Sequence, residues 1–130
     1  MSVPMRLHRW DEIALEKITE MMSRKIIPGE KLLLAHVYLK RGALVPLHSH
    51  ESEQMTYVLQ GALRFQVAGE EIVVREGEVL RIASRVDHQA EALDDTLELD
   101  VFSPARQEWL SSEEPQLLAE DGMEGVRRRT

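Results

Sequence analysis

Three imidazoles in this sequence have the types and spacing to hold a metal ion. His48 and His50 stand two positions apart, and His88 lies downstream. In an extended segment, residues two apart point to the same side, so the first two imidazoles would face one space. Three imidazole nitrogens can hold a divalent transition metal and leave open positions for a substrate. We therefore predict one divalent metal per chain, with nickel, zinc, manganese, iron and cobalt all compatible.

Gln54 is the predicted fourth ligand. Its even number matches those of His48 and His50, so a regular strand would turn all three side chains inward while Glu53 faces solvent. A neutral amide oxygen leaves more positive charge on a metal than a glutamate would, which favours Lewis-acid polarisation of a bound oxygen. The alternative role of Gln54 is an interior hydrogen bond without metal contact.

The composition excludes several other functions. The chain has 130 residues, a formal net charge of -7 and no cysteine. The absence of cysteine excludes disulfides, thiolate metal sites and cysteine nucleophiles. The negative charge argues against nucleic acid or an anionic membrane surface as the main partner. No apolar run resembles a signal peptide or a membrane span, so we expect a cytoplasmic protein.

Short strands are the elements that must position these residues. Segments rich in Val, Leu, Ile and Tyr, separated by turn residues, occupy 31–40, 54–59, 62–67, 71–75, 79–83 and 96–102. This spacing predicts a single all-β domain over residues 1–130, a sandwich or barrel with its core at about 19–103. We expect residues 19–27 to form an edge strand rather than to continue a helix over 11–22. A helical turn is expected at 104–110, and a poorly ordered polar tail at 111–130.

Two motifs resemble those of the cupin family. The spacing of the first motif is kept by Gly42, His48, His50, Gln54 and Gly61, with glutamine where glutamate is usual. Gly77 and His88 keep the skeleton of the second motif, although Arg85 stands where glycine is common. The resemblance implies a double-stranded β-helix, which is a jelly-roll barrel. The departure at Arg85 predicts that the loop at 84–87 differs in shape from that of the usual motif, at the mouth of the pocket.

A more specific resemblance covers residues 99–106, with the sequence LDVFSPAR, together with residues 45–50, 53–54 and 91–93. These segments are similar to the KdgF-type pectin-degradation cupins, which are small homodimers. Those proteins open the unsaturated monouronates left by pectate and alginate lyases to the linear 5-keto-4-deoxyuronate. The resemblance implies a homodimer that acts on a small sugar acid. It implies the metal ligands His48, His50, Gln54 and His88 and the active-site residues Asp100, Phe102 and Arg106.

The residues of that segment support the same interpretation. Asp100 and Phe102 would face one way along a strand, opposite to Leu99 and Val101. A buried carboxylate is costly unless it is paired or functional, so Asp100 is the candidate for proton transfer. Phe102 would pack against the sugar or shield the site. Arg106 either clamps a substrate carboxylate or forms a structural ion pair with Asp100.

Two alternative functions stay open. The first is another metal-dependent cupin enzyme, such as an oxygenase or a carbon–carbon lyase, with the same ligands. The second is a cupin that binds a sugar acid without catalysis.

The expected edge strand also supports a homodimer. Residues 19–27 would present unpaired backbone groups that the sheet of a second copy could satisfy.

Overall fold

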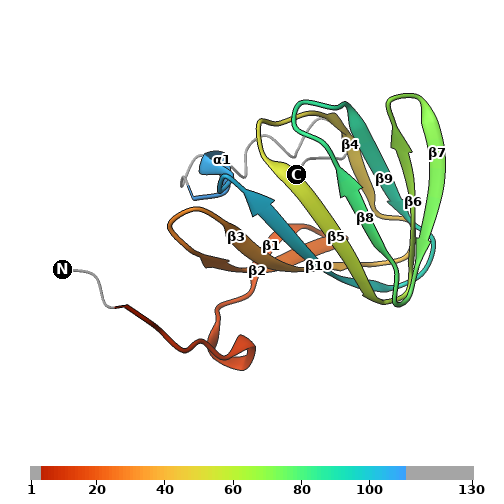
Figure 1. The fold of residues 1–130 in the computed structure, drawn as a ribbon. Coiled ribbons are helices and arrows are strands. Elements are labelled where there is room, and N and C mark those ends of the chain that lie inside the picture. The colour runs from red at the N-terminus through yellow and green to blue at the C-terminus, as the bar shows by residue number, and fades with distance from the viewer. Residues whose placement is uncertain (1–3, 111–130) are drawn as a thin grey trace.

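The computed structural model describes residues 4–110, and two antiparallel sheets dominate this part of the chain (Figure 1). The strands are β1 (Glu16–Thr19), β2 (Met22–Pro28), β3 (Leu33–Leu39), β4 (Leu44–His48), β5 (Glu53–Gln60), β6 (Ala62–Val67), β7 (Glu70–Arg75), β8 (Val79–Ile82), β9 (His88–Ala92) and β10 (Thr96–Ser103). A 3-10 helix, η1 (Trp10–Glu12), precedes them, and a short helix, α1 (Gln107–Leu110), follows. The predicted all-β jelly-roll fold is confirmed.

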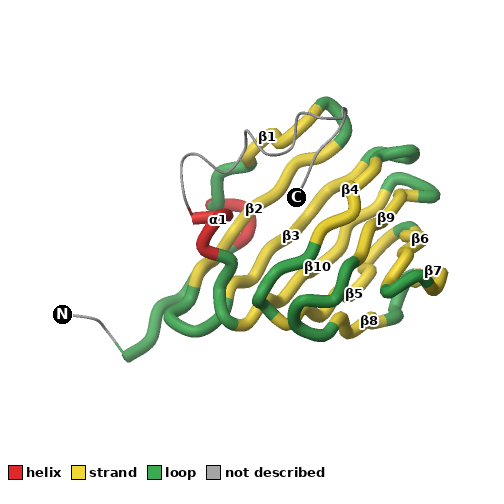
Figure 2. The backbone as a smooth tube through the Cα atoms, turned by 90° about the horizontal axis from the view of Figure 1, so that it is seen from above, coloured by secondary structure: helices red, strands yellow, loops and turns green. Residues whose placement is uncertain are grey.

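The two sheets enclose the core. The larger sheet has the order β1-β2-β3-β10-β5-β8 and the smaller one β4-β9-β6-β7, as the view from above shows (Figure 2). Strict alternation of buried and more exposed residues along β3 and β10 turns every second side chain inward. Leu33 from the larger sheet and Leu63 from the smaller one are at most 1% exposed. Full burial of each such side chain stabilises the fold by about 1.5–3 kcal/mol.

Strands β4 and β9 were absent from the segments predicted by composition, yet they carry two of the three histidines. β4 contains Pro46, and β9 has the sequence HQAEA, whose residue types have low β propensity. Pairing makes these segments strands, since His48 lies opposite His88 and β4 forms an edge where a proline is tolerated.

The prediction for residues 19–27 was wrong in its boundaries and its place in the sheet. The segment divides into β1 and β2, joined by a tight turn in which the Met21 amide donates to Thr19 Oγ1 at 3.0 Å. β2 pairs with β1 on one side and β3 on the other, so β1 is the edge strand. The sheet edge expected over residues 19–27 therefore lies on Glu16–Thr19 instead.

The remaining expectations concern the ends of the chain. α1 lies within the predicted helical turn at 104–110. The expected tail at 111–130 lies outside the described residues. Between residues 4 and 110, no helix is long and apolar enough to cross a membrane.

Gly61 makes the tight passage from one sheet to the other, between β5 and β6. Its φ of +93° lies in the left-handed region, and a Cβ atom there would sit 2.4 Å from the Asp95 carbonyl oxygen. Only glycine fits both the backbone conformation and this close approach.

Candidate metal centre

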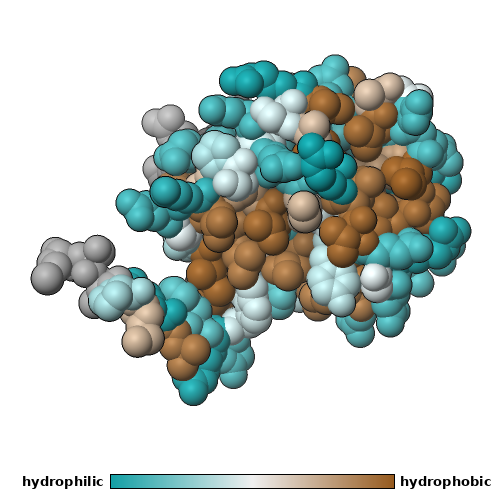
Figure 3. Space-filling view, viewed as in Figure 1, coloured by the Kyte–Doolittle hydropathy of each residue, from teal (hydrophilic) through white to brown (hydrophobic). Residues whose placement is uncertain are grey.

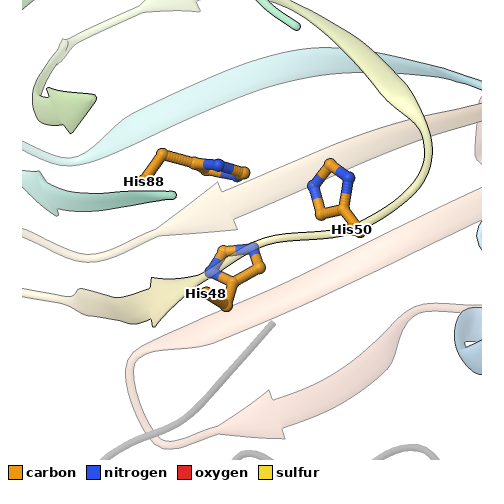
Figure 4. Close-up of side chains that lie close together, drawn as sticks. All are labelled: His48, His50 and His88. Carbon is orange, nitrogen blue, oxygen red and sulfur yellow. The ribbon is translucent and has the colours of Figure 1, made fainter. Parts of the chain in front are cut away.

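The three predicted histidines come together at one end of the barrel. His48 ends β4, His50 lies in the loop before β5, and His88 begins β9. One ligand atom from each lies within 4.8 Å of the others. The rings point toward one another, with centroids 4.4–5.4 Å apart (Figure 4). The three histidines are therefore positioned to bind a metal ion.

Backbone carbonyls fix the tautomer of all three rings. Each Nδ1 lies within hydrogen-bond distance of a carbonyl oxygen, at 2.7, 2.9 and 2.8 Å from those of Pro46, Ser52 and Val86. A carbonyl only accepts, so each Nδ1 carries the proton and each Nε2 presents a lone pair. A second hydrogen bond of this kind is how proteins orient metal-binding histidines.

The surroundings of the Nε2 atoms fit a divalent cation. His88 Nε2 is buried and has no hydrogen-bond partner among the described residues. His50 Nε2 lies 3.1 Å from Gln54 Oε1, so two electron-pair donors face each other when the proton is on Nδ1. Burial is the main cause, and the charge of Arg106 the second, of a pKa of about 4 for His50. His50 Nε2 therefore stays unprotonated near neutral pH and cannot donate a hydrogen bond to Gln54 Oε1. A metal ion would satisfy these donors together.

Gln54 connects the histidines to a hydrogen-bond chain inside the barrel. It is buried on β5, whereas Glu53 faces outward and pairs with Arg81 at 2.6 Å. Gln54 Nε2 donates to Thr56 Oγ1 at 2.8 Å, and the Thr56 hydroxyl donates to Asp100 Oδ1 at 2.7 Å. Thr56 was not predicted, although its spacing of two from Gln54 places it on the same face.

Asp100 and Phe102 lie on the inner face of β10, and Leu99 and Val101 face outward, as their alternation predicted. Burial raises the pKa of the Asp100 carboxyl to about 6, while the Thr56 hydrogen bond and the Arg106 guanidinium act to lower it. Phe102 meets the His50 ring edge to face, with centroids 5.7 Å apart. Asp100 and Phe102 therefore both line the space beside the histidines.

Arg106 closes one side of this space. Its guanidinium carbon lies 5.2 Å from the Phe102 ring centroid and 4.7 Å from that of Trp109. Its salt bridge among the described residues is with Glu108, at 2.7 Å, rather than with Asp100. A guanidinium carries five N–H donors in a planar fork that matches the geometry of a carboxylate.

The loop that carries His50 is held from two sides. Ser52 Oγ donates to the Pro104 carbonyl at 2.6 Å, and the Arg85 amide donates to the His50 carbonyl at 2.8 Å. Arg85 has a φ of +64°, the left-handed conformation that glycine favours. The loop at 84–87 therefore keeps a glycine-type backbone conformation without a glycine, at a cost of about 1–2 kcal/mol.

A small cavity of about 40 Å³ lies beside these groups. His48, His88 and Gln54 line it together with the inward residues of β10. Among the lining residues that sequence reasoning missed are Arg24, Glu98 and Trp109. Glu98 shares the even numbering of Asp100 and Phe102, so the same alternation would have identified it.

Comparison with known proteins agrees with this architecture. The cupin domain family matches residues 35–103. KdgF from Halomonas sp. is 32% identical, with a TM-score of 0.72, over 76% of this chain and 94% of that chain. An RmlC-like cupin from Shewanella frigidimarina is 24% identical, with a TM-score of 0.76, over 81% and 96%. Oxalate decarboxylase from Bacillus subtilis, which has Mn(II) centres, is 21% identical, with a TM-score of 0.65, over 73% and 28%.

No curated protein sequence matches the chain significantly. The family match covers more than half of the chain. The likeness to oxalate decarboxylase shows a shared fold, whereas the geometry of the three histidines is what supports a metal site. The chain belongs to the cupin family and resembles KdgF.

Proposed function

We propose that this protein is a metal-dependent enzyme that opens 4,5-unsaturated monouronates to the linear 5-keto-4-deoxyuronate. The observation that carries the proposal is a buried carboxylate, Asp100, in the same pocket as the histidine cluster and the Arg106 guanidinium. The similarity to KdgF supports it. A divalent metal held by His48, His50, His88 and Gln54 would supply a Lewis acid for the substrate carboxylate and a neighbouring oxygen.

Asp100 is the group that moves the proton in this proposal. Its carboxylate accepts the proton of the anomeric hydroxyl, and the bond between the anomeric carbon and the ring oxygen breaks to give an aldehyde and an enolate. The neutral Asp100 then returns that proton to the C4 carbon, so the enolate becomes a ketone and Asp100 is ionised again. Atoms balance without water, so the reaction is an isomerisation. A positioned acid–base group contributes about 10²–10⁴-fold in rate.

Arg106 and Phe102 serve the substrate rather than the proton. Arg106 offers N–H groups from a buried position, where a charge-assisted hydrogen bond to the uronate carboxylate is strong. Phe102 presents an apolar ring beside His50 that excludes water from the reacting carbons.

Two substitutions test this division of roles. Asp100→Asn keeps the size of the side chain but removes the proton acceptor, so we expect turnover to fall by roughly 10²-fold or more with metal content unchanged. Arg106→Ala should act mainly by raising KM. The assay follows the loss of the conjugated ultraviolet absorbance of an unsaturated monouronate, and elemental analysis follows the metal. Wild-type turnover in Asp100→Asn would exclude Asp100 as the base.

A separate observation decides between this activity and the alternatives. If the wild-type protein, loaded in turn with each compatible metal, leaves the absorbance to decay at its spontaneous rate, the uronate activity is wrong. Oxygen uptake by the iron-loaded protein would then identify an oxygenase. Saturable binding of a sugar acid without turnover would identify a binding protein.

A further inference from the structure

Glu98 is a buried carboxyl that the proposed reaction leaves unused. It lies on β10 two residues before Asp100, and both side chains face inward. Glu98 is 6% exposed and Asp100 is 4% exposed, and both line the pocket beside the histidines. Glu98 Oε1 has no hydrogen-bond partner among the described residues. An ionised carboxylate in such a position has a large desolvation cost, so we expect Glu98 to have a specific role.

The hydrogen-bond chain gives the two carboxyls different protonation states. Gln54 Nε2 can only donate, so the Thr56 oxygen accepts from it and the Thr56 hydroxyl proton goes to Asp100 Oδ1. Asp100 therefore receives a donor that stabilises its ionised form. Two adjacent buried carboxyls do not both ionise without a large cost, so the proton of the pair belongs on Glu98.

The other charged groups around Glu98 leave this assignment intact. Its neighbours across the sheet on β3 and β5 are Val37 and Val58, which carry no charge. Arg24 from β2 and Arg106 after β10 line the same pocket. Arg24 forms a salt bridge with Glu16 at 2.9 Å, and Arg106 forms one with Glu108 at 2.7 Å. Among the described residues, neither guanidinium forms a salt bridge with Glu98, although Arg24 Nη1 is buried in the same pocket.

We propose that Glu98 is a positioning residue that, as a neutral acid, donates a hydrogen bond to Asp100 and keeps that carboxylate ionised for the substrate. Burial and the neighbouring Asp100 charge both raise the pKa of Glu98, well above its ordinary value. Through the reaction, Glu98 retains its own proton while Asp100 accepts one from the anomeric hydroxyl and gives one to C4. The catalytic consequence rests on the proposed function, but the protonation state does not.

Infrared spectroscopy tests the protonation state without any turnover. The zinc-loaded full-length protein at neutral pH should show the carbonyl stretch of a protonated carboxylic acid. Glu98→Gln should lose that band, whereas Asp100→Asn should retain it at a shifted frequency, because the group that accepts the hydrogen bond has changed. The proposal is overturned if the wild-type protein lacks the band, or if Asp100→Asn rather than Glu98→Gln removes it. An inactive protein with the expected band would refute the uronate function alone.

Kinetics then test whether Glu98 acts through Asp100. Glu98→Gln keeps an N–H donor without a charge, so its kcat/KM profile against pH should stay within about threefold of the wild type. Glu98→Leu removes the donor, so the midpoint of the acid limb should move to higher pH by about one unit or more. At pH values below the midpoints of both proteins, kcat of the variant should be roughly tenfold lower, with little change in KM. Two profiles equal to the wild type would indicate a merely structural Glu98. Equal loss of kcat in both variants would mean that Glu98 itself transfers the proton.

Discussion

The hydrogen bond from Thr56 to Asp100 offers a quantitative test of the proposed base. Thr56 is fully buried, and its hydroxyl lies 2.8 Å from Gln54 Nε2 and 2.7 Å from Asp100 Oδ1. Valine has nearly the same shape without the hydroxyl. Thr56→Val therefore removes the donor that stabilises the ionised Asp100 and leaves the histidines in place.

The expected size of the effect follows from the charge on the acceptor. A hydrogen bond to a charged group contributes about 1.5–3 kcal/mol, and about 1.4 kcal/mol corresponds to one pH unit in a titration midpoint. Burial raises the pKa of Asp100 to about 6, so activity that needs the carboxylate is lost as the pH falls through that region. Loss of the donor favours the protonated form of Asp100, so the midpoint of the acid limb should move to higher pH by roughly 1–2 units. Below both midpoints, the rate should be roughly 10- to 100-fold lower, and well above them nearly unchanged.

The assay compares kcat/KM of the wild type, Thr56→Val and Thr56→Ser on an unsaturated monouronate between about pH 5 and pH 9. Thr56→Ser keeps the hydroxyl and should retain the wild-type acid limb. A bound divalent cation lowers the midpoints of all three proteins, so the difference between variants is the quantity to compare. Coincident profiles of Thr56→Val and the wild type, with equal metal content, would show that Asp100 is not the base that sets the acid limb.

Two further predictions concern the metal and the assembly. His88→Ala should lose most of the metal in elemental analysis and keep its β circular dichroism, whereas His36→Ala, which changes a histidine outside the cluster, should keep the metal. We also predict a homodimer that covers the outer face of β10, β5 and β8, where Met55, Tyr57 and Val79 are 40–56% exposed and hydrophobic residues gather across the middle of the view (Figure 3). Tyr57→Lys should weaken the dimer in sedimentation equilibrium; a wild-type protein that is monomeric at every concentration would exclude it.

The alternation of side chains along a strand explains both which inward residues of β10 the sequence predicted and which one it missed. Alternation gives two faces to a strand, and motif spacing identified Asp100 and Phe102 as the inward set. Here the inward set contains carboxyls and the outward set contains Leu99 and Val101, the reverse of an ordinary amphipathic strand. Glu98 was not singled out, although the argument that turned Asp100 inward applies to Glu98 equally.

Other features depended on contacts that no local pattern encodes. His50 lies in a loop rather than on a regular strand, so its even numbering alone did not fix its direction; hydrogen bonds to Ser52 and from Arg85 do. Strand β9 exists because β4 and β6 pair with it on both sides. Arg24 reaches the pocket from β2, and the sequence predicted a single edge strand over residues 19–27 where β1 and β2 lie.

The glutamine at position 54 is consistent with the proton chemistry assigned to β10. Glutamine both presents Oε1 toward His50 and donates Nε2–H to Thr56, so the Thr56 hydroxyl proton is directed to Asp100. A glutamate would accept that proton instead and add a third carboxyl beside Asp100 and Glu98. Both effects stabilise the protonated form of Asp100.

Gln54→Glu should therefore retain or tighten metal binding, since a carboxylate is a stronger ligand, while the acid limb of uronate turnover moves to higher pH by roughly one unit or more. Metal titration by calorimetry and the pH profile separate the two effects. An unshifted acid limb with tighter metal binding would show that Gln54 acts only as a ligand and that the chain to Asp100 has no part in catalysis. A shifted limb would mean that glutamine at this position sets the base as well as holding the metal.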